Sequence, residues 1–369
     1  MNSRQKALRL EALELISRMG EGSSGRMLSS IDLIEGLYFG EENGRQIFKH
    51  DPRLPQWEER DYFVLSKIEA LPGLHAVLKK AGYSLPEVLP FFPNRKVPGV
   101  EVTTEQHGYG LCMAVGMAQA IQIGRLNQHV FCLVGDYELD HGSAWEAIMV
   151  AAERKLDRLC LILDENSPND ILWQERFESF GWKVIKLRDA HDHDEIVYGI
   201  MKARLTLRKP TCIWAPTKKS AGVPFAERKV EYDDAVFSEM ELQEIRTHLL
   251  GPLFMLLDIK LTQLGLKIKN LVILDLSFPT GKFPEFKKAY ESRFIHLPGR
   301  TELALPFAGG LSAFGKIVLI YGMDSDDCEL PDRTLNVKLV EEGPEGKWDI
   351  LEEELKVFGP AVLLIPEED

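Results

Sequence analysis

The stretch HVFCLVGDYELDHGSAWEAIMVAAERKLDRLCLILDENSPND, residues 129–170, decides the fold. Residues 129–134 form a short apolar run rich in strand-forming side chains, which GDYE at 135–138 interrupts. Residues 143–155 then carry apolar side chains at helical spacing, and 159–163 form a second apolar run. This order of strand, turn, helix and strand predicts a parallel βαβ unit.

Side chains with oxygen atoms follow both expected strands. Asp136 comes directly after the first strand, and Asn166 follows the second strand 30 positions later. The carboxyl ends of parallel strands meet at one edge of a sheet, and open α/β folds bind their ligands at that edge. The sequence therefore predicts that Asp136 and Asn166 lie side by side at a ligand-binding edge.

Composition indicates a globular protein and excludes some partners. The chain has 369 residues, of which 45% are hydrophobic and 27% charged, so it is long enough for two ordinary domains. Its formal net charge is −13 and its pI is about 5.3, which argues against nucleic acid or an anionic membrane surface as a partner. We expect neither kind of partner.

The N-terminus and the cysteines indicate a cytoplasmic protein. MNSRQKALRLEALELISRM, residues 1–19, carries charges throughout its apolar stripe, which is typical of an amphipathic helix rather than a signal peptide. No apolar stretch approaches the roughly 20 residues that a membrane span needs. The five cysteines are scattered and form no CxxC motif, so we expect buried free thiols in a reducing compartment.

The sequence around Asp136 and Asn166 resembles the thiamin-diphosphate signature, Gly-Asp-Gly followed by Asn, in the form found in the transketolase family. The match continues through HGSAWEAIMVAAERKLDRLCLILDEN at 141–166. Five other segments resemble the same family, at residues 20–40, 60–76, 93–110, 177–200 and 210–227, and residues 251–369 resemble it more weakly.

This resemblance implies an α/β protein with two doubly wound parallel-sheet domains of the thiamin-diphosphate-binding fold. Residues 1–230 correspond to the diphosphate- and metal-binding domain, and 231–250 to a linker. Residues 251–369 correspond to a shortened pyrimidine-binding domain, and the C-terminal domain of transketolases is expected to be absent.

The resemblance also implies a cofactor, thiamin diphosphate, with Mg²⁺ or Ca²⁺. Carried over from the family, the metal ligands are the side chains of Asp136 and Asn166 and the backbone carbonyl of Pro168. Hard divalent cations prefer such oxygen ligands. The implied cofactor-binding positions are Gly108, Gly110, Gly135, Asp136, Glu138 and Asn166.

Several positions depart from the family pattern. The second glycine of Gly-Asp-Gly is Tyr137, where glycine would allow close backbone approach to a ligand or a positive φ. The family histidine that faces the diphosphate is replaced by Glu69, an anion beside anionic phosphates. Two other active-site histidines are replaced by Ser23 and Phe92, and residues 228–233 contain no counterpart of a substrate-binding histidine that the family has there.

Two residues are candidates for acid or base chemistry. His107 stands where the family has an apolar residue; it is either a new acid or base, or a histidine with a surface or hydrogen-bonding role. The glutamate that activates the cofactor in the family aligns with Thr301, and a shift of one residue would place Glu302 there.

These observations leave three functional hypotheses. We favour a transketolase-like protein that is degenerate for sugar ketol transfer and is retained as a scaffold, partner or regulator. The alternatives are an active transketolase-type transferase, and a diverged thiamin-dependent lyase or transferase that uses His107, Tyr109 and Glu302. The family implies a homodimer and, if the protein is active, a sugar-phosphate substrate. The sequence names no substrate, partner or pathway.

Overall fold

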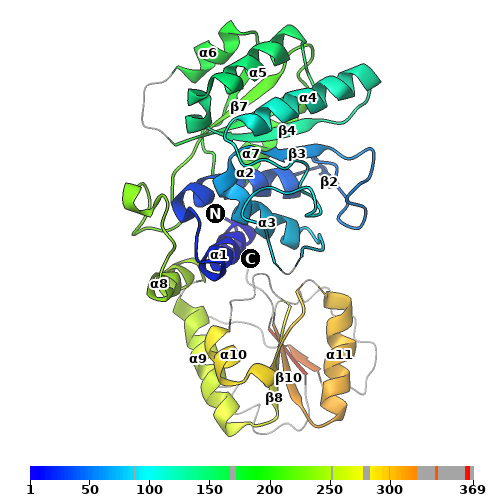
Figure 1. The fold of residues 1–369 in the computed structure, drawn as a ribbon. Helices are drawn as coiled ribbons and strands as arrows, with labels where there is room; N and C mark the ends of the chain where they lie inside the picture. The colour runs from blue at the N-terminus through cyan, green and yellow to red at the C-terminus, as the bar shows by residue number, and fades with distance from the viewer. Residues whose placement is uncertain are drawn as a thin grey trace. The chain divides into compact units, whose positions relative to one another are not determined.

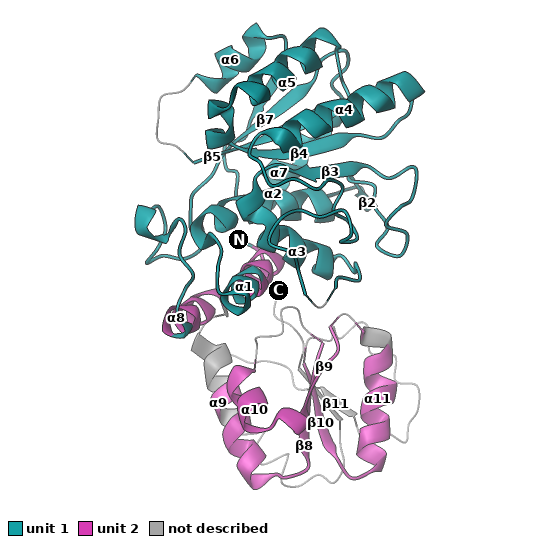
Figure 2. Cartoon of the chain, in the orientation of Figure 1, with its two compact units in different colours: residues 1, 12–239 teal, residues 2–11, 240–369 magenta. Residues whose placement is uncertain are grey.

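The computed structural model describes residues 1–86, 88–166, 172–250, 252–276, 283–298, 300–321, 337–339 and 362–365. Contacts between residues divide the chain into two units, one of residues 1 and 12–239 and one of residues 2–11 and 240–369 (Figure 2). The first helix, α1, spans Ser3–Met19. The stretch expected as a linker, 231–250, contains helix α8 (Glu239–Leu250). The division at 230 and 251 stays a prediction.

The first unit contains a five-stranded sheet in the order β3-β4-β5-β7-β6, in which every neighbouring pair is parallel. Its strands are β3 (Tyr62–Leu65), β4 (Val130–Gly135), β5 (Leu159–Glu165), β6 (Lys183–Lys186) and β7 (Thr211–Pro216). A separate hairpin pairs β1 (Glu41–Glu42) with β2 (Arg45–Gln46). The βαβ unit predicted from residues 129–170 is thus confirmed as β4, α5 and β5.

Helices cover both faces of this sheet (Figure 1). One face carries α4 (Tyr109–Gly124), α5 (Gly142–Glu153) and α6 (Trp173–Ser179). The other carries α2 (Ser24–Phe39), α3 (Leu71–Lys80) and α7 (His193–Arg204). Strands β4 and β5 are buried on both faces, which explains why each reads as an unbroken apolar run instead of an alternating one.

The second unit contains another five-stranded parallel sheet, ordered β11-β12-β10-β8-β9. Its strands are β8 (Leu271–Asp275), β9 (Phe294–His296), β10 (Ile317–Tyr321), β11 (Val337–Leu339) and β12 (Val362–Ile365). Helices α9 (Pro252–Lys267) and α10 (Pro284–Ala289) lie on one face and α11 (Thr301–Ala313) on the other. Two parallel sheets, each covered by helices, confirm the predicted fold class.

Two expectations about cellular context can be compared with the described residues. None of the helices in the described part of the chain is long and apolar enough to cross a membrane. Cys112, Cys132, Cys160 and Cys212 are free thiols, of which the last three are buried, and Cys328 lies outside the described residues.

Candidate functional site

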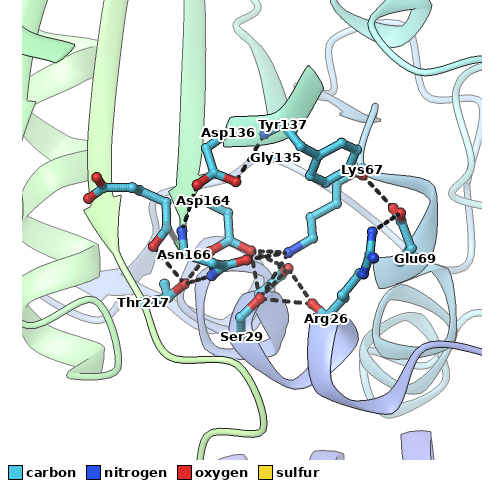
Figure 3. A network of polar contacts seen from close by, with 12 residues as sticks. Arg26, Ser29, Lys67, Glu69, Gly135, Asp136, Tyr137, Asp164, Asn166 and Thr217 are labelled. Atoms are coloured by element: carbon cyan, nitrogen blue, oxygen red, sulfur yellow. Dashed lines mark hydrogen bonds and ion pairs between the residues drawn. The ribbon is translucent and has the colours of Figure 1, made fainter. Parts of the chain in front are cut away.

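Asp136 and Asn166 meet at the carboxyl edge of the first sheet. Strands β4 and β5 pair in parallel with Gly135 opposite Asp164, so the residues that follow the two strands leave the sheet at the same level. The backbone N–H of Asn166 donates to Oδ2 of Asp136 at 3.1 Å. The predicted juxtaposition is therefore present, and Figure 3 shows the two residues beside each other.

The side chain of Asn166 is oriented by two bonds from its amide nitrogen. Nδ2 donates to Oγ1 of Thr217 at 2.6 Å and to Oδ1 of Asp164 at 3.2 Å. Oδ1 of Asn166 accepts a hydrogen bond from Nζ of Lys67 at 3.4 Å. Pro168, the third expected metal ligand, lies outside the described residues.

A buried ion pair between Lys67 and Asp164 supports this edge. Both side chains are fully buried, and their atoms Nζ and Oδ2 lie 2.5 Å apart. The hydroxyls of Ser29 and Ser30 also donate to Oδ2, at 2.8 and 2.6 Å. Burial alone would raise the pKa of Asp164, but Lys67 and the hydroxyl donors hold that pKa below its usual value. The carboxylate is therefore ionised.

Lys67, Asp164 and the two serines were missed as site residues from the sequence. Asp164 stands two positions before Asn166 at the end of a strand, and Lys67 follows the strand at 62–65 through Ser66. Their positions after strands could have indicated them as site residues, because neighbouring parallel strands end at a common edge of the sheet.

The carboxylate of Glu138 joins three segments around the site. Its Oε1 accepts from Oγ of Ser66 at 2.6 Å and from N–H of Gly108 at 2.8 Å, and its Oε2 accepts from N–H of Gly135 at 2.8 Å. Burial raises the pKa of Glu138, against the lowering effect of these donors. Glu138 has no solvent exposure, so its visible role is to fix the loops; a contact to cofactor stays a prediction.

Gly108 and Gly110 each meet a steric requirement. Gly108 has φ +80° immediately before α4, a left-handed conformation that favours glycine. A Cβ on Gly110 would lie 2.6 Å from Cα of Ser66, so α4 can approach the end of β3 only without a side chain there. These two predicted cofactor positions thus bring α4 against the loop after β3.

Tyr137 does not adopt the positive φ that a glycine would allow. It lies in a short 3₁₀ helix, Asp136–Asp140, and is not among the residues with left-handed φ. Unlike a glycine, Tyr137 has a ring, and this ring occupies space next to Gly135. A Cβ atom built on Gly135 would lie 2.5 Å from the ring. The tyrosine side chain therefore folds back over the backbone of Gly135.

The phenol of Tyr137 is bonded to Glu69, the other departure from the family pattern. Its hydroxyl donates to Oε2 of Glu69 at 2.5 Å, and Nη1 of Arg26 lies 3.4 Å from Oε1 of the same carboxylate (Figure 3). Burial, then the carboxylates of Glu138 and Glu69, raise the pKa of Tyr137 far above its usual value. The phenol is therefore a permanent donor, and the two replacements form one complementary contact.

His107 packs against this contact. Its ring lies edge-on to that of Tyr137, with centroids 5.2 Å apart, and near the ring of His141 at 6.2 Å. Nδ1 of His107 is buried and has no hydrogen-bond partner in the described part of the chain. His107 thus stands at the predicted edge of the sheet, with one ring nitrogen unsatisfied.

The remaining expected positions supply no histidine. Ser23 donates through Oγ to Oδ1 of Asp234 at 2.8 Å, and Phe92 is 44% exposed. Glu302 and Thr301 begin helix α11, and their side chains lie outside the described part of the structure. The acid–base role assigned to Glu302 stays a prediction.

The side chains of the site can be compared with the two parts of the expected ligand, the metal ion and the diphosphate. The carboxylate of Asp136 and the amide oxygen of Asn166 fit a hard divalent cation. The side chains next to them do not fit a diphosphate, because Glu69 presents an anion and Tyr137 fills the space over Gly135. The oxygen atoms of Asp136 and Asn166 are thus suited to a metal ion, whereas Glu69 and Tyr137 are unfavourable neighbours for a diphosphate.

Residues 2–252 match a family model described as transketolase, thiamine diphosphate binding domain. The chain is 35% identical over 245 residues to the 6-deoxy-6-sulfo-D-fructose transketolase subunit SqwG of Clostridium sp. (strain MSTE9), covering 60% of this chain and 86% of that protein. It is 32% identical to Homo sapiens transketolase over 243 residues, covering 60% of this chain but only 37% of that protein.

A solved structure shows the same fold. The transketolase of Campylobacter jejuni superposes with a TM-score of 0.58 at 19% identity, covering 87% of this chain and 65% of that chain. At this level of identity the match supports the fold alone, and the chain spans less than two thirds of that transketolase.

Proposed function

The chain belongs to the transketolase family, and from this premise we propose that it is a member degenerate for sugar ketol transfer, acting as a scaffold or binding partner. The hydrogen bond between Tyr137 and Glu69 carries this proposal. Both residues replace ones that the family uses beside the cofactor diphosphate, and each satisfies the other.

The electrostatic cost of a diphosphate here supports the proposal. The side chain of Glu69 is 14% exposed, and its compensation comes from the phenol of Tyr137 and one guanidinium, that of Arg26. Two like unit charges about 5 Å apart repel by roughly 3 kcal/mol at an effective dielectric constant near 20, and a diphosphate carries more than one charge. A bound diphosphate would also have to displace the ring from Gly135.

The missing proton-handling groups support the same conclusion. Positions that hold active-site histidines in the family are Ser23, Glu69 and Phe92 here. A lost general acid or base commonly lowers a rate by factors of about 10² to 10⁴. Several losses together would leave ketol transfer negligible, while residues that build the sheet and its helices are retained.

Calorimetry with thiamin diphosphate and Mg²⁺ tests this proposal. We expect no saturable heat with the full chain, and no ketose turnover with a panel of ketose donors and aldehyde acceptors. Asp136→Ala serves as the site variant and Asp140→Ala, an exposed carboxylate in the same 3₁₀ helix, as its matched control. Saturable binding that only the Asp136 variant abolishes, together with turnover, would overturn the proposal.

The adjacency of Asp136 and Asn166 favours a second candidate, a thiamin-diphosphate-dependent transketolase-type transferase or a diverged lyase. Asp136, Asn166 and the carbonyl of Pro168 would then hold Mg²⁺ or Ca²⁺, and His107 and Glu302 would be the acid–base candidates. The substrate would be a sugar phosphate. Binding without ketose turnover would leave the diverged reaction as the candidate.

We further propose a homodimer in the cytoplasm. Helix α4 exposes apolar side chains at helical spacing, Tyr109, Met113 and Ile123, at 50%, 39% and 76% exposure, which suits a face covered by a second subunit. The buried free thiols suit a reducing compartment. A strictly monomeric mass by light scattering at micromolar concentration would contradict the dimer.

A further inference from the structure

A cavity of about 440 Å³ lies in the first unit, away from the site at the carboxyl edge. It is lined by the β1–β2 hairpin and the segment after it, residues 42–49, and by the end of helix α7, residues 201–205. Asp61 and His129, which lie behind the cavity wall, directly precede β3 and β4 and so mark the amino edge of the sheet.

Arg204 is held in this wall by a buried carboxylate. Nη1 of Arg204 donates to Oδ2 of Asp61 at 2.6 Å, and the Asp61 side chain has no solvent exposure. Asp61 also accepts from the backbone N–H groups of Lys49, at 3.0 Å, and His129, at 2.7 Å. The carboxylate is thus surrounded by donors, and the guanidinium is fixed in place with 20% of its side chain still exposed.

Two further cations line the cavity without a partner. The side chains of Arg45 and Lys49 are exposed and make no hydrogen bond or ion pair within the described residues. The lining contains one carboxylate, Glu42, directly opposite Arg45 in the hairpin. The chain has a net charge of −13, so three cations around one cavity make this part of its surface locally positive.

The pKa of the buried His129 is also affected by these positive charges. Burial, followed by the charges of Arg204, Arg158 and Lys49, lowers the pKa of His129 to about 3. The histidine is therefore neutral at physiological pH. The three cations of the cavity, Arg45, Lys49 and Arg204, outnumber the two carboxylates beside them, Asp61 and Glu42, which favours an anion supplied by a ligand.

We propose that this cavity binds a small phosphorylated molecule, whose phosphate is held by Arg45, Lys49 and Arg204. Its volume lies in the range of small-ligand sites, about 300–1,000 Å³. Arginine and lysine are the side chains that bind phosphate through charge-assisted hydrogen bonds. Ile47 and Met201 add apolar surface to the wall, which suits a ligand with a non-polar part next to its phosphate.

Calorimetric titration of the full chain with phenyl phosphate, in the presence of a chelator, tests this site. The chelator removes divalent cations, so binding cannot depend on a metal at Asp136 and Asn166. Inorganic phosphate is titrated in parallel, to separate recognition of the phosphate from recognition of the whole ester. We expect one saturable site that prefers phenyl phosphate.

Variants locate the binding. Arg45→Gln with Lys49→Gln should weaken it at least about tenfold, the loss expected for two charged contacts. Met201→Glu, which adds a carboxylate to the wall, should weaken it as well. Lys229→Gln, at an exposed lysine outside the lining, and Asp136→Ala should leave it unchanged. The absence of saturable binding, or equal binding by all variants, would overturn the proposal.

Discussion

The hydroxyl of Tyr137 donates to the carboxylate of Glu69 across 2.5 Å, although 68 positions separate the two residues in the chain. Each residue alone would be unfavourable beside a diphosphate: one adds bulk over Gly135 and the other adds an anion. Together they form a satisfied pair at the edge of the sheet. The two replacements are therefore best understood as one change in the site.

Removing both members of the pair should favour binding of a diphosphate at this edge of the sheet. We expect the double variant Tyr137→Gly/Glu69→His to bind thiamin diphosphate with Mg²⁺ in calorimetry, since it frees the space over Gly135 and removes the anion. Tyr137→Phe, which keeps the ring and loses only the hydroxyl, is the matched control and should not bind. Equal behaviour of the two variants would show that the tyrosine ring is not the obstacle.

Breaking the buried pair of Lys67 and Asp164 should destabilise the first unit strongly. Lys67→Met leaves a carboxylate with no solvent exposure and no cation, which typically costs about 3–5 kcal/mol. Chemical denaturation monitored by circular dichroism measures the change in free energy of unfolding. The double variant Lys67→Met/Asp164→Leu should lose much less than the sum of the single losses, because no charge is then stranded. Additive losses would contradict a coupled pair.

Gly110 and Gly116 in helix α4 form a matched pair of positions. A Cβ at 110 meets Cα of Ser66 at 2.6 Å, so Gly110→Ala should lower the free energy of unfolding by about 1–3 kcal/mol. A Cβ at 116 meets nothing within 4 Å, so Gly116→Ala should raise it by about 0.5–1 kcal/mol through helix propensity. Thermal denaturation of both variants checks the two signs.

His75 should make the fold sensitive to mild acid. Burial lowers its pKa to about 4, and its Nε2 has no hydrogen-bond partner among the described residues. As the pH falls from about 6.5 to about 4, the unfolded chain takes up a proton that the folded chain refuses, so stability is progressively lost. The total loss is about 3 kcal/mol.

Replacement by an untitratable residue isolates this effect. His75→Met should show a shallower decline of the free energy of unfolding between pH 6.5 and 4, measured by urea denaturation. Asp164 does not interfere in this pH range. Its pKa is lowered, so its contribution to the free energy of unfolding is lost only at still lower pH. Identical slopes for variant and wild type would exclude His75 as the cause.

The α/β class and the predicted edge of the site follow from local patterns. Residues 129–170 show strand and helix periodicity within one βαβ unit, and parallel pairing brings Asp136 next to Asn166 whatever the rest of the chain does. The functional meaning of the replacements could not be obtained in this way. Tyr137 and Glu69 were each anticipated as obstacles to a diphosphate, but not as partners.

The sequence by itself determined the fold class, the family and the place where Asp136 and Asn166 meet, because periodicity and strand-end position depend on neighbouring residues. Only the tertiary structure decided which side chains pair across that edge. Tyr137 reaches Glu69, Lys67 reaches Asp164, and Arg204 reaches Asp61, over 68, 97 and 143 positions of sequence. Such contacts depend on how separate strands and helices pack, and no local pattern in the chain encodes that packing.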